Sequence, residues 1–275
     1  MGGQKIKGKI YALLLIFMML FVGLGSITAA DTNLLTDENN VFVVGFDSDF
    51  PPFGYVDDNG EYTGFDIELA KEVAKRNNWS FVAQPLPSWD TKDTELNSEI
   101  VDCIWSELTI NGRENDYTWS KPYFNNSQVV VVRSDSGIDS LSDLRNKTVE
   151  VQEGNSVFNN LENDKKSLSD SFKSLVKIKD YNMGFMDLET GVCDAIIVDI
   201  GSAKYLLKEK GASGQYKILD EPLAYEVYGI GFKKGNEELR NQVQDTLDEM
   251  YADGTVDKIA QKYSNYGITD GLLRP

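Results

Sequence analysis

Strands and helices are predicted to alternate along this chain, and the same order of elements occurs twice. The first set begins with an apolar strand at 41–46 and ends with a short strand at 103–105. The second set begins with a strand at 147–152 and ends with a strand at 195–198. Strands that alternate with helical stretches are typical of parallel sheets covered by helices. The sequence therefore predicts two α/β lobes of related design.

Several helix boundaries are predicted from residues that favour particular helix positions. Asp66, Ser156 and Thr255 are each predicted to be the N-cap of a helix, because a short oxygen-bearing side chain can accept a hydrogen bond from a free backbone N–H. A longer helix is predicted over 237–252, where Asp-Gly follows the last apolar residue.

Extended runs at 127–133 and 225–232 are predicted to join the two halves. If the chain leaves the first lobe at one run and returns at the other, lobe one comprises 31–126 and 222–275. Lobe two then comprises 127–221. The predicted fold class is α/β, with two lobes that are each a mixed, mainly parallel sheet flanked by helices, and with two hinge crossings. The cleft between such lobes is the default ligand site.

Residues 1–30 have the three-part pattern of an export signal. Three lysines precede an apolar run over 10–24, and Thr28-Ala29-Ala30 offers small residues for cleavage. An uncleaved membrane anchor is the alternative, because 6–27 is nearly long enough to span a bilayer. No cysteine lies near the end of the run, so a lipid anchor is not expected. We expect a periplasmic or extracellular protein, free or tethered by its N-terminus.

Charge and composition exclude several classes of function. The chain has 44 acidic against 27 basic residues, a formal net charge of -17, which argues against nucleic-acid binding. It has no histidine, which excludes Ser-His and Cys-His nucleophile pairs and histidine metal sites. Cys103 and Cys193 fall in different lobes, so we predict buried free thiols. No metal or cofactor is expected.

Polar side chains follow several of the predicted strands, where ligands of open α/β sheets bind. Arg113 and the helix start at Ser156 can hold a carboxylate with charged and backbone N–H donors. Asp199 can hold an ammonium group, and the ring of Phe50 or Trp89 can pack on the remainder of a ligand. This set of residues suits a zwitterion.

The residues alone leave other interpretations open. Arg113 could be a surface arginine paired with Glu114 or Asp116. Asp199 could cap a helix that begins at the next residue. Phe50 could be a core residue.

The ordered motifs of the chain resemble those of the family 3 solute-binding proteins, which are the polar amino-acid receptors of ABC importers. The likeness covers about residues 41 to 265. It rests on the segments Gly45-Phe-Asp-Ser-Asp-Phe-Pro-Pro-Phe53, Gly64-Phe-Asp-Ile-Glu-Leu-Ala70, Leu108-Thr-Ile-Asn-Gly-Arg113, Trp119-Ser-Lys-Pro-Tyr123, Leu141-Ser-Asp-Leu144 and Asp194-Ala-Ile-Ile-Val-Asp199.

The resemblance implies a two-lobed periplasmic-binding-protein fold and a receptor without enzymatic activity. Such a receptor binds a free amino acid between its lobes and delivers it to ABC permease subunits, and we expect a monomer. By the family pattern, Arg113, Thr109 and Ser156 hold the α-carboxylate and Asp199 holds the α-ammonium. The implied ligand-binding residues are Asp47, Phe50, Trp89, Ser106, Thr109, Arg113, Ser156 and Asp199.

Two departures from the family pattern concern the ligand. The arginine segment is one residue shorter than usual, and Glu107 stands where a glycine or serine is common. Asp47 and Glu107 together favour a polar or cationic amino acid over an acidic one, because buried like charges repel. An enzyme of the same fold, dehydratase-like with Glu107 as general acid, and a ligand-sensing ectodomain are the alternative functions.

Overall fold

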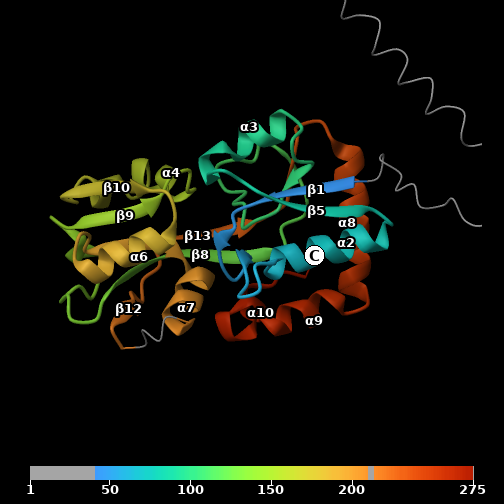
Figure 1. Cartoon of the computed structure of the whole chain (residues 1–275). Helices are drawn as coiled ribbons and strands as arrows, with labels where there is room; N and C mark the ends of the chain where they lie inside the picture. Colours follow the sequence, from blue (N-terminus) through green and yellow to red (C-terminus); the bar gives the residue numbers. More distant parts are fainter. Residues whose placement is uncertain (1–40, 210–213, 275) are drawn as a thin grey trace, which may run out of the picture. The chain divides into compact units, whose positions relative to one another are not determined.

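Two main β-sheets and a small third sheet organise the chain (Figure 1). The computed structural model describes residues 41–209 and 214–274. Both main sheets contain parallel and antiparallel strand pairs. Helices flank the sheets, so the predicted α/β class with mixed sheets is confirmed.

The first sheet has the strand order β5-β1-β6-β14-β7. β1 pairs in parallel with β5 and β6, whereas β14 pairs antiparallel with β6 and β7. Because β14 comes from late in the sequence, the chain returns to complete this sheet. Its strands are β1 (Val41–Phe46), β5 (Ser80–Pro85), β6 (Cys103–Ile104), β7 (Thr118–Trp119) and β14 (Gly231–Phe232). The small sheet packed beside it comprises β2 (Asp49–Phe50), β3 (Gly54–Val56) and β4 (Tyr62–Thr63).

The second sheet has the order β10-β9-β11-β8-β12, and β13 also pairs with β8. β9 pairs in parallel with β10 and β11, and β8 is antiparallel to all its partners. Every residue of β11 is buried, as expected for a central strand. The strands are β8 (Phe124–Arg133), β9 (Thr148–Gln152), β10 (Ser174–Ile178), β11 (Ala195–Asp199), β12 (Tyr216–Ile218) and β13 (Ala224–Tyr228).

Amphipathic helices cover the sheets. α2 buries apolar residues at helical spacing against β5, α8 and α9, while α6 and α7 pack on β11. The helices are α2 (Phe65–Arg76), α3 (Lys92–Asn97), α4 (Val157–Glu162), α5 (Lys166–Ser169), α6 (Tyr181–Thr190), α7 (Ile200–Glu209), α8 (Glu237–Ala252), α9 (Thr255–Lys262) and α10 (Ile268–Gly271). Short 3-10 turns are η1 (Trp89–Thr91), η2 (Leu141–Leu144) and η3 (Ser264–Tyr266).

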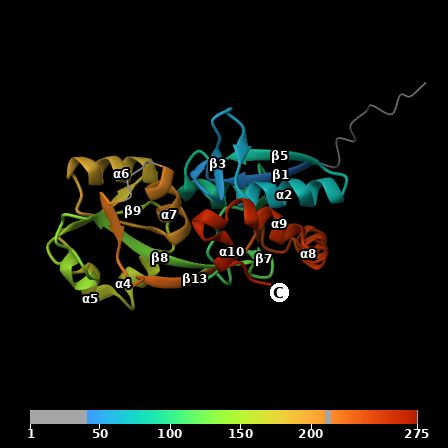
Figure 2. The same cartoon turned by 90° about the horizontal axis from the view of Figure 1, so that it is seen from below.

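β8 and β13 of the second sheet run side by side and extend from it towards the first sheet (Figure 2). Phe124 of β8 and Tyr228 of β13 stack with ring centroids 5.6 Å apart. The ring of Phe53, from the first part of the chain, lies 5.2 Å from Phe124 and 5.5 Å from Tyr228. This aromatic cluster fixes the loop after β1 against the crossing strands. The lobe boundaries at 126/127 and 221/222 stay a prediction.

The predicted caps at Asp66, Ser156 and Thr255 are wrong in their side-chain role. The carboxyl of Asp66 points into the core and accepts hydrogen bonds from the backbone N–H of Glu107 and the hydroxyl of Tyr123, each at 2.9 Å. Ser156 occupies the N-cap position of α4, but its side chain makes no capping bond. At α9 the cap position belongs to a glycine, and Thr255 is the first helical residue. A residue type that favours capping thus lies at each helix start, but all three side chains bond to distant partners instead, Thr255 to Arg76 and Ser156 to Glu226.

The helix predicted over 237–252 is confirmed as α8. Cys103 and Cys193 are buried free thiols, as predicted. Within 41–209 and 214–274, no helix is long and apolar enough to cross a membrane. The predicted export signal at 1–30 lies outside the described residues.

We predict that Gly64→Ala lowers the free energy of unfolding by at least about 2 kcal/mol. Gly64 precedes α2 with a φ of 122°, and a Cβ there would meet the carbonyl group of Phe53. The matched control is Gly137→Ala. Gly137 also has a positive φ, 71°, but a methyl group added there would meet open space. Urea unfolding measures both variants, and an equal cost for the two would contradict the backbone clash at Gly64.

Candidate functional site

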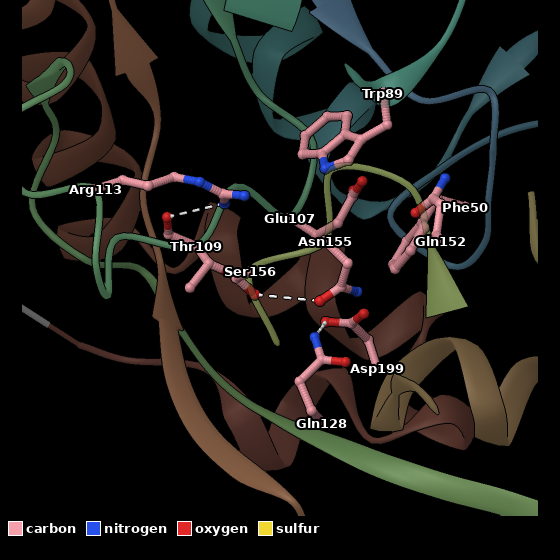
Figure 3. Close-up of a pocket in the computed structure, with 10 residues that line it drawn as sticks. All are labelled: Phe50, Trp89, Glu107, Thr109, Arg113, Gln128, Gln152, Asn155, Ser156 and Asp199. Carbon is pink, nitrogen blue, oxygen red and sulfur yellow. Dashed lines mark hydrogen bonds between the residues drawn. The ribbon is translucent and has the colours of Figure 1, made fainter. Parts of the chain in front are cut away.

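A pocket lies between the two main sheets, near the crossing strands (Figure 3). It holds about 250 Å³ of space between protein atoms, including the solvent at its mouth. Six of the eight predicted ligand-binding residues line it. The complete lining is Phe50, Trp89, Glu107, Thr109, Arg113, Gln128, Gln152, Asn155, Ser156 and Asp199.

Arg113 brings a positive charge to the pocket without a neutralising acid. One of its nitrogens, Nη2, donates to the backbone oxygen of Gly154 at 2.8 Å, and Nη1 lies 3.5 Å from the backbone oxygen of Thr109. Among the described residues Arg113 forms no ion pair, so the alternative of a surface pair with Glu114 or Asp116 is not observed. Its remaining N–H donors can receive an anion.

Asp199 forms the opposite, negative end of the pocket. It is the last residue of β11 and is buried. Its Oδ1 accepts a hydrogen bond from Gln128 Nε2 at 3.0 Å, and also from the amide of Asn126 and the hydroxyl of Tyr228. The same two amides donate to Oε1 of Glu226. Side chains of the crossing strands therefore hold the two buried carboxyl groups together.

This arrangement lacks a hydrogen-bond donor with a positive charge. Burial raises the pKa of Asp199 to about 7, and the nearby charge of Glu226 adds to the rise. The side-chain oxygens Asn126 Oδ1 and Gln128 Oε1 are buried and without a partner. Unpartnered buried acceptors are costly. An ammonium group, with three donors and one positive charge, supplies what this end of the pocket lacks.

Ser156 and Asn155 occupy the turn before α4. Asn155 Oδ1 accepts the backbone N–H of Val157, the first residue of α4, at 2.8 Å. Ser156 Oγ instead donates to Glu226 Oε2 at 2.6 Å. Ser156 thus links the turn of the second sheet to strand β13, and its hydroxyl still lines the pocket.

A second group of acids lies beside the pocket. Ser106 Oγ donates to Glu107 Oε2 at 2.6 Å and accepts the backbone N–H of Asp47 at 3.0 Å. Gln152 Nε2 donates to Asp47 Oδ2 at 2.7 Å. Burial raises the pKa of Asp47, and burial raises that of Glu107 well above its ordinary value, helped by the charges of Asp47 and Asp66. Asp47 and Ser106 do not line the pocket themselves but hold residues that do.

Two aromatic residues complete the walls. Phe50 is buried and packs its ring edge-on to Tyr181, with centroids 5.6 Å apart. Phe50 therefore belongs both to the core and to the wall of the pocket, which were the two alternatives that the sequence left open. Trp89 is 7% exposed, and the ammonium of Lys92 lies 5.2 Å from its ring centroid.

Direct hydrogen bonds connect the two sides of the pocket. Arg113 bonds to Gly154, and Asp47 bonds to Gln152, at the distances given above. In each pair one residue precedes β8 and the other follows it. Hydrogen bonds therefore hold the two sides of the pocket together in this structure. Within the described residues, no group of three or more acidic or cysteine side chains is placed to hold a metal ion.

The sequence interpretation missed Gln128, Gln152 and Asn155 in the lining and Glu226 behind it. Gln128 directly precedes a run of four valines in the predicted joining strand, and Asn126 and Ser127 precede it. Several polar side chains at the start of a strand that is predicted to be buried are a signal of such a site. Glu226 gave no comparable signal, because alternating strand positions are commonly polar.

Comparisons with known proteins agree with this geometry. The family model for bacterial extracellular solute-binding proteins, family 3, matches residues 42–266. The L-cystine-binding protein TcyJ of Escherichia coli (strain K12) is 29% identical over 258 residues, which cover 91% of this chain and 93% of that protein. An ABC uptake transporter substrate binding protein from Streptococcus pneumoniae, solved with bound histidine, is 29% identical with a TM-score of 0.78 and covers 86% of this chain and 97% of its own. An ancestral arginine-binding protein bound to arginine is 34% identical with a TM-score of 0.74, and the match covers 82% of this chain and 98% of that chain.

We predict that the ligand-free protein loses stability as the pH rises from 5 to 8. The folded-state pKa of Asp199 is about 7, against 3.8 for an ordinary aspartate, so the folded state binds more protons than the unfolded state in this range. Stability is then greatest below the lower pKa and falls as the pH rises through the higher one, by about 3 kcal/mol for this group between pH 5 and 8.

Asp199→Asn should flatten this pH dependence, because asparagine does not ionise. Part of the slope stays in place, because burial also raises the pKa of Asp66 to about 7 and raises the pKa values of Asp47 and Glu107. The control is Asp58→Asn at an exposed position. Urea unfolding at four pH values measures the slopes, and identical slopes for Asp199→Asn and the unmodified protein would overturn the assignment.

Proposed function

Because this chain belongs to the family 3 bacterial extracellular solute-binding proteins, we propose that it is an extracytoplasmic receptor that closes around a free amino acid. It is a binding protein and not an enzyme. The relatives described above are also binding proteins. The dehydratase-like alternative is therefore dropped. We propose that the closed form delivers its ligand to the permease subunits of an ABC importer.

One observation carries the proposal of an amino-acid ligand. A guanidinium without an ion pair and a buried carboxyl group surrounded by unpartnered acceptors face the same pocket. The α-carboxylate of an amino acid fits Arg113, with the hydroxyls of Thr109 and Ser156 beside it. The α-ammonium fits Asp199 and the free amide oxygen of Gln128. A zwitterion satisfies both ends of the pocket at once, which a simple anion or cation does not.

The ligand is proposed to stabilise the closed arrangement. Arg113 comes from the segment before β8, whereas Ser156 and Asp199 come from the segments after it. A ligand that touches all three binds the closed state more tightly than an open one, and therefore shifts the population towards closure. The bond from Arg113 to Gly154 uses one N–H of the guanidinium and leaves others for the carboxylate.

Residues 1–30 bear on where the receptor works. We propose that they export the protein, which then acts as a monomer in the periplasm or at the cell surface. Cleavage gives a freely diffusing receptor, and retention of the apolar run over 10–24 gives a tethered one. N-terminal sequencing of the exported protein distinguishes the two outcomes.

We predict that Arg113→Ala weakens binding of every amino-acid ligand by on the order of 100-fold, because truncation leaves the ligand carboxylate buried without its cation. The ligand is first found by thermal-shift screening of the twenty amino acids with ornithine and cystine, and affinities are then measured by calorimetry. Arg145→Ala is the matched control, because Arg145 is exposed and outside the pocket.

Arg145→Ala should bind as the unmodified protein does. Full affinity in Arg113→Ala would remove that residue from its role. The absence of binding by any member of the screen to the unmodified protein would refute the receptor proposal itself.

A further inference from the structure

The geometry points to a ligand whose side chain carries a second positive charge, as in arginine, lysine and ornithine, and to Glu107 as the residue that selects it. This inference rests on the proposed function of the cleft as an amino-acid site. It adds the chemical class of the side chain and the residue that recognises it.

Glu107 is held rigidly at the wall of the pocket. It is 5% exposed, and its backbone has a φ of 42°, a left-handed conformation that is uncommon for residues other than glycine. Its backbone N–H donates to the buried carboxyl of Asp66 at 2.9 Å. Backbone strain of this kind persists where the surrounding structure enforces it, and it clusters at functional sites.

The carboxyl of Glu107 is only half satisfied. Oε2 accepts the hydroxyl of Ser106 at 2.6 Å, whereas Oε1 accepts no hydrogen bond from residues 41–209 and 214–274. Glu107 is therefore a buried side chain that lines the pocket with one free carboxyl oxygen, and this oxygen can accept a donor from a ligand.

The charges that face Glu107 are of its own sign. The acids Asp47, Asp66 and Asp199 act on it electrostatically, and the hydroxyl of Tyr123 shares its neighbour Asp66. No lysine or arginine of the described chain forms an ion pair with it. A buried carboxylate without a cation is unstable, so Glu107 ionises when a positive group enters the pocket.

Two cations at or beside the pocket have other partners. Arg113 is assigned to the α-carboxylate, and the ammonium of Lys92 lies 3.8 Å from Asp93 and over the ring of Trp89. A cationic ligand can therefore supply the positive partner that Glu107 lacks.

The position of Glu107 fits the side-chain end of the ligand. Asp47 has the largest charge effect on Glu107, and Asp47 is bonded to Gln152. In Figure 3, Gln152 and Phe50 lie on the opposite side of the pocket from Arg113. A ligand with its carboxylate at Arg113 thus extends its side chain towards these acids. The rings of Phe50 and Trp89 can contact a flat or flexible cationic chain there.

The same charges disfavour other ligands. Glutamate would add a carboxylate among acids. Cystine has a second ammonium but also a second carboxylate, and among the described lining residues Arg113 is the one cation. We therefore expect cystine to bind more weakly than arginine, although TcyJ is named for cystine.

Paired ligands of matched shape test the inference. Citrulline has the shape of arginine without the charge, and we expect arginine to bind at least 30-fold more tightly at pH 7.5. In Glu107→Gln the preference should fall below threefold through loss of arginine affinity, while citrulline affinity stays within threefold of that of the unmodified protein. Glu153→Gln, an exposed acid on the turn beside the pocket, is the control and should keep the preference.

Calorimetry in two buffers of different ionisation enthalpy provides a second readout on the unmodified protein. Between pH 6 and 7, arginine should release more protons on binding than citrulline does, because its charge ionises Glu107. This readout stands even if Glu107→Gln does not fold.

The outcomes separate the two proposals. Binding of amino acids with no preference for arginine over citrulline, or a preference unchanged in folded Glu107→Gln, overturns the role of Glu107 and leaves the receptor proposal intact. Equal proton release on binding of arginine and of citrulline also overturns the role of Glu107 and leaves the receptor proposal intact. A protein that binds none of these amino acids refutes the receptor proposal, and this inference with it.

Discussion

The burial of carboxyl groups at the strand crossing is the constraint on which the rest of this structure depends. Asn126 and Gln128 on β8 donate to both Asp199 and Glu226, which come from different parts of the chain. Two acids held this close are unstable as a pair of carboxylates without a cation. The described part of the protein has no cation beside these two buried acids, and we propose that the ammonium group of a ligand supplies one.

The fold places a positively charged group, Arg113, across the cleft from these acids. The sheets meet at two adjacent strands, so the segments on either side of β8 approach each other over the pocket. Arg113 and Asp47 on one side already bond to Gly154 and Gln152 on the other. These few polar bonds close the cleft, but they leave the charges of Arg113 and Asp199 unbalanced. A zwitterion can balance both and so hold the lobes together more firmly than the protein alone does.

Sequence periodicity and composition were sufficient to predict the helices and strands, but not the hydrogen-bond partners of the buried polar side chains. The bounds of β1 and α8 follow the sequence closely, because continuous apolar runs and helical spacing directly reflect burial. The role of Asp66 was misassigned, because a carboxylate near a helix start can serve a cap or a distant backbone N–H, and only tertiary structure decides. Arg113, Asp199 and Phe50 could be assigned to the site since strand ends meet there. Asn126 and Glu226 could not, because their meeting depends on the register of β8 with β13.

Small-angle X-ray scattering can show whether a zwitterion holds the two lobes together. The radius of gyration is measured for the protein purified through unfolding and refolding to remove bound ligand, and again with a mixture of the twenty amino acids, ornithine and cystine. We expect a smaller radius of gyration and a narrower distance distribution with the mixture, and no such change in Arg113→Ala. Identical scattering curves for the unmodified protein in both conditions, together with no heat of binding by calorimetry, would contradict it.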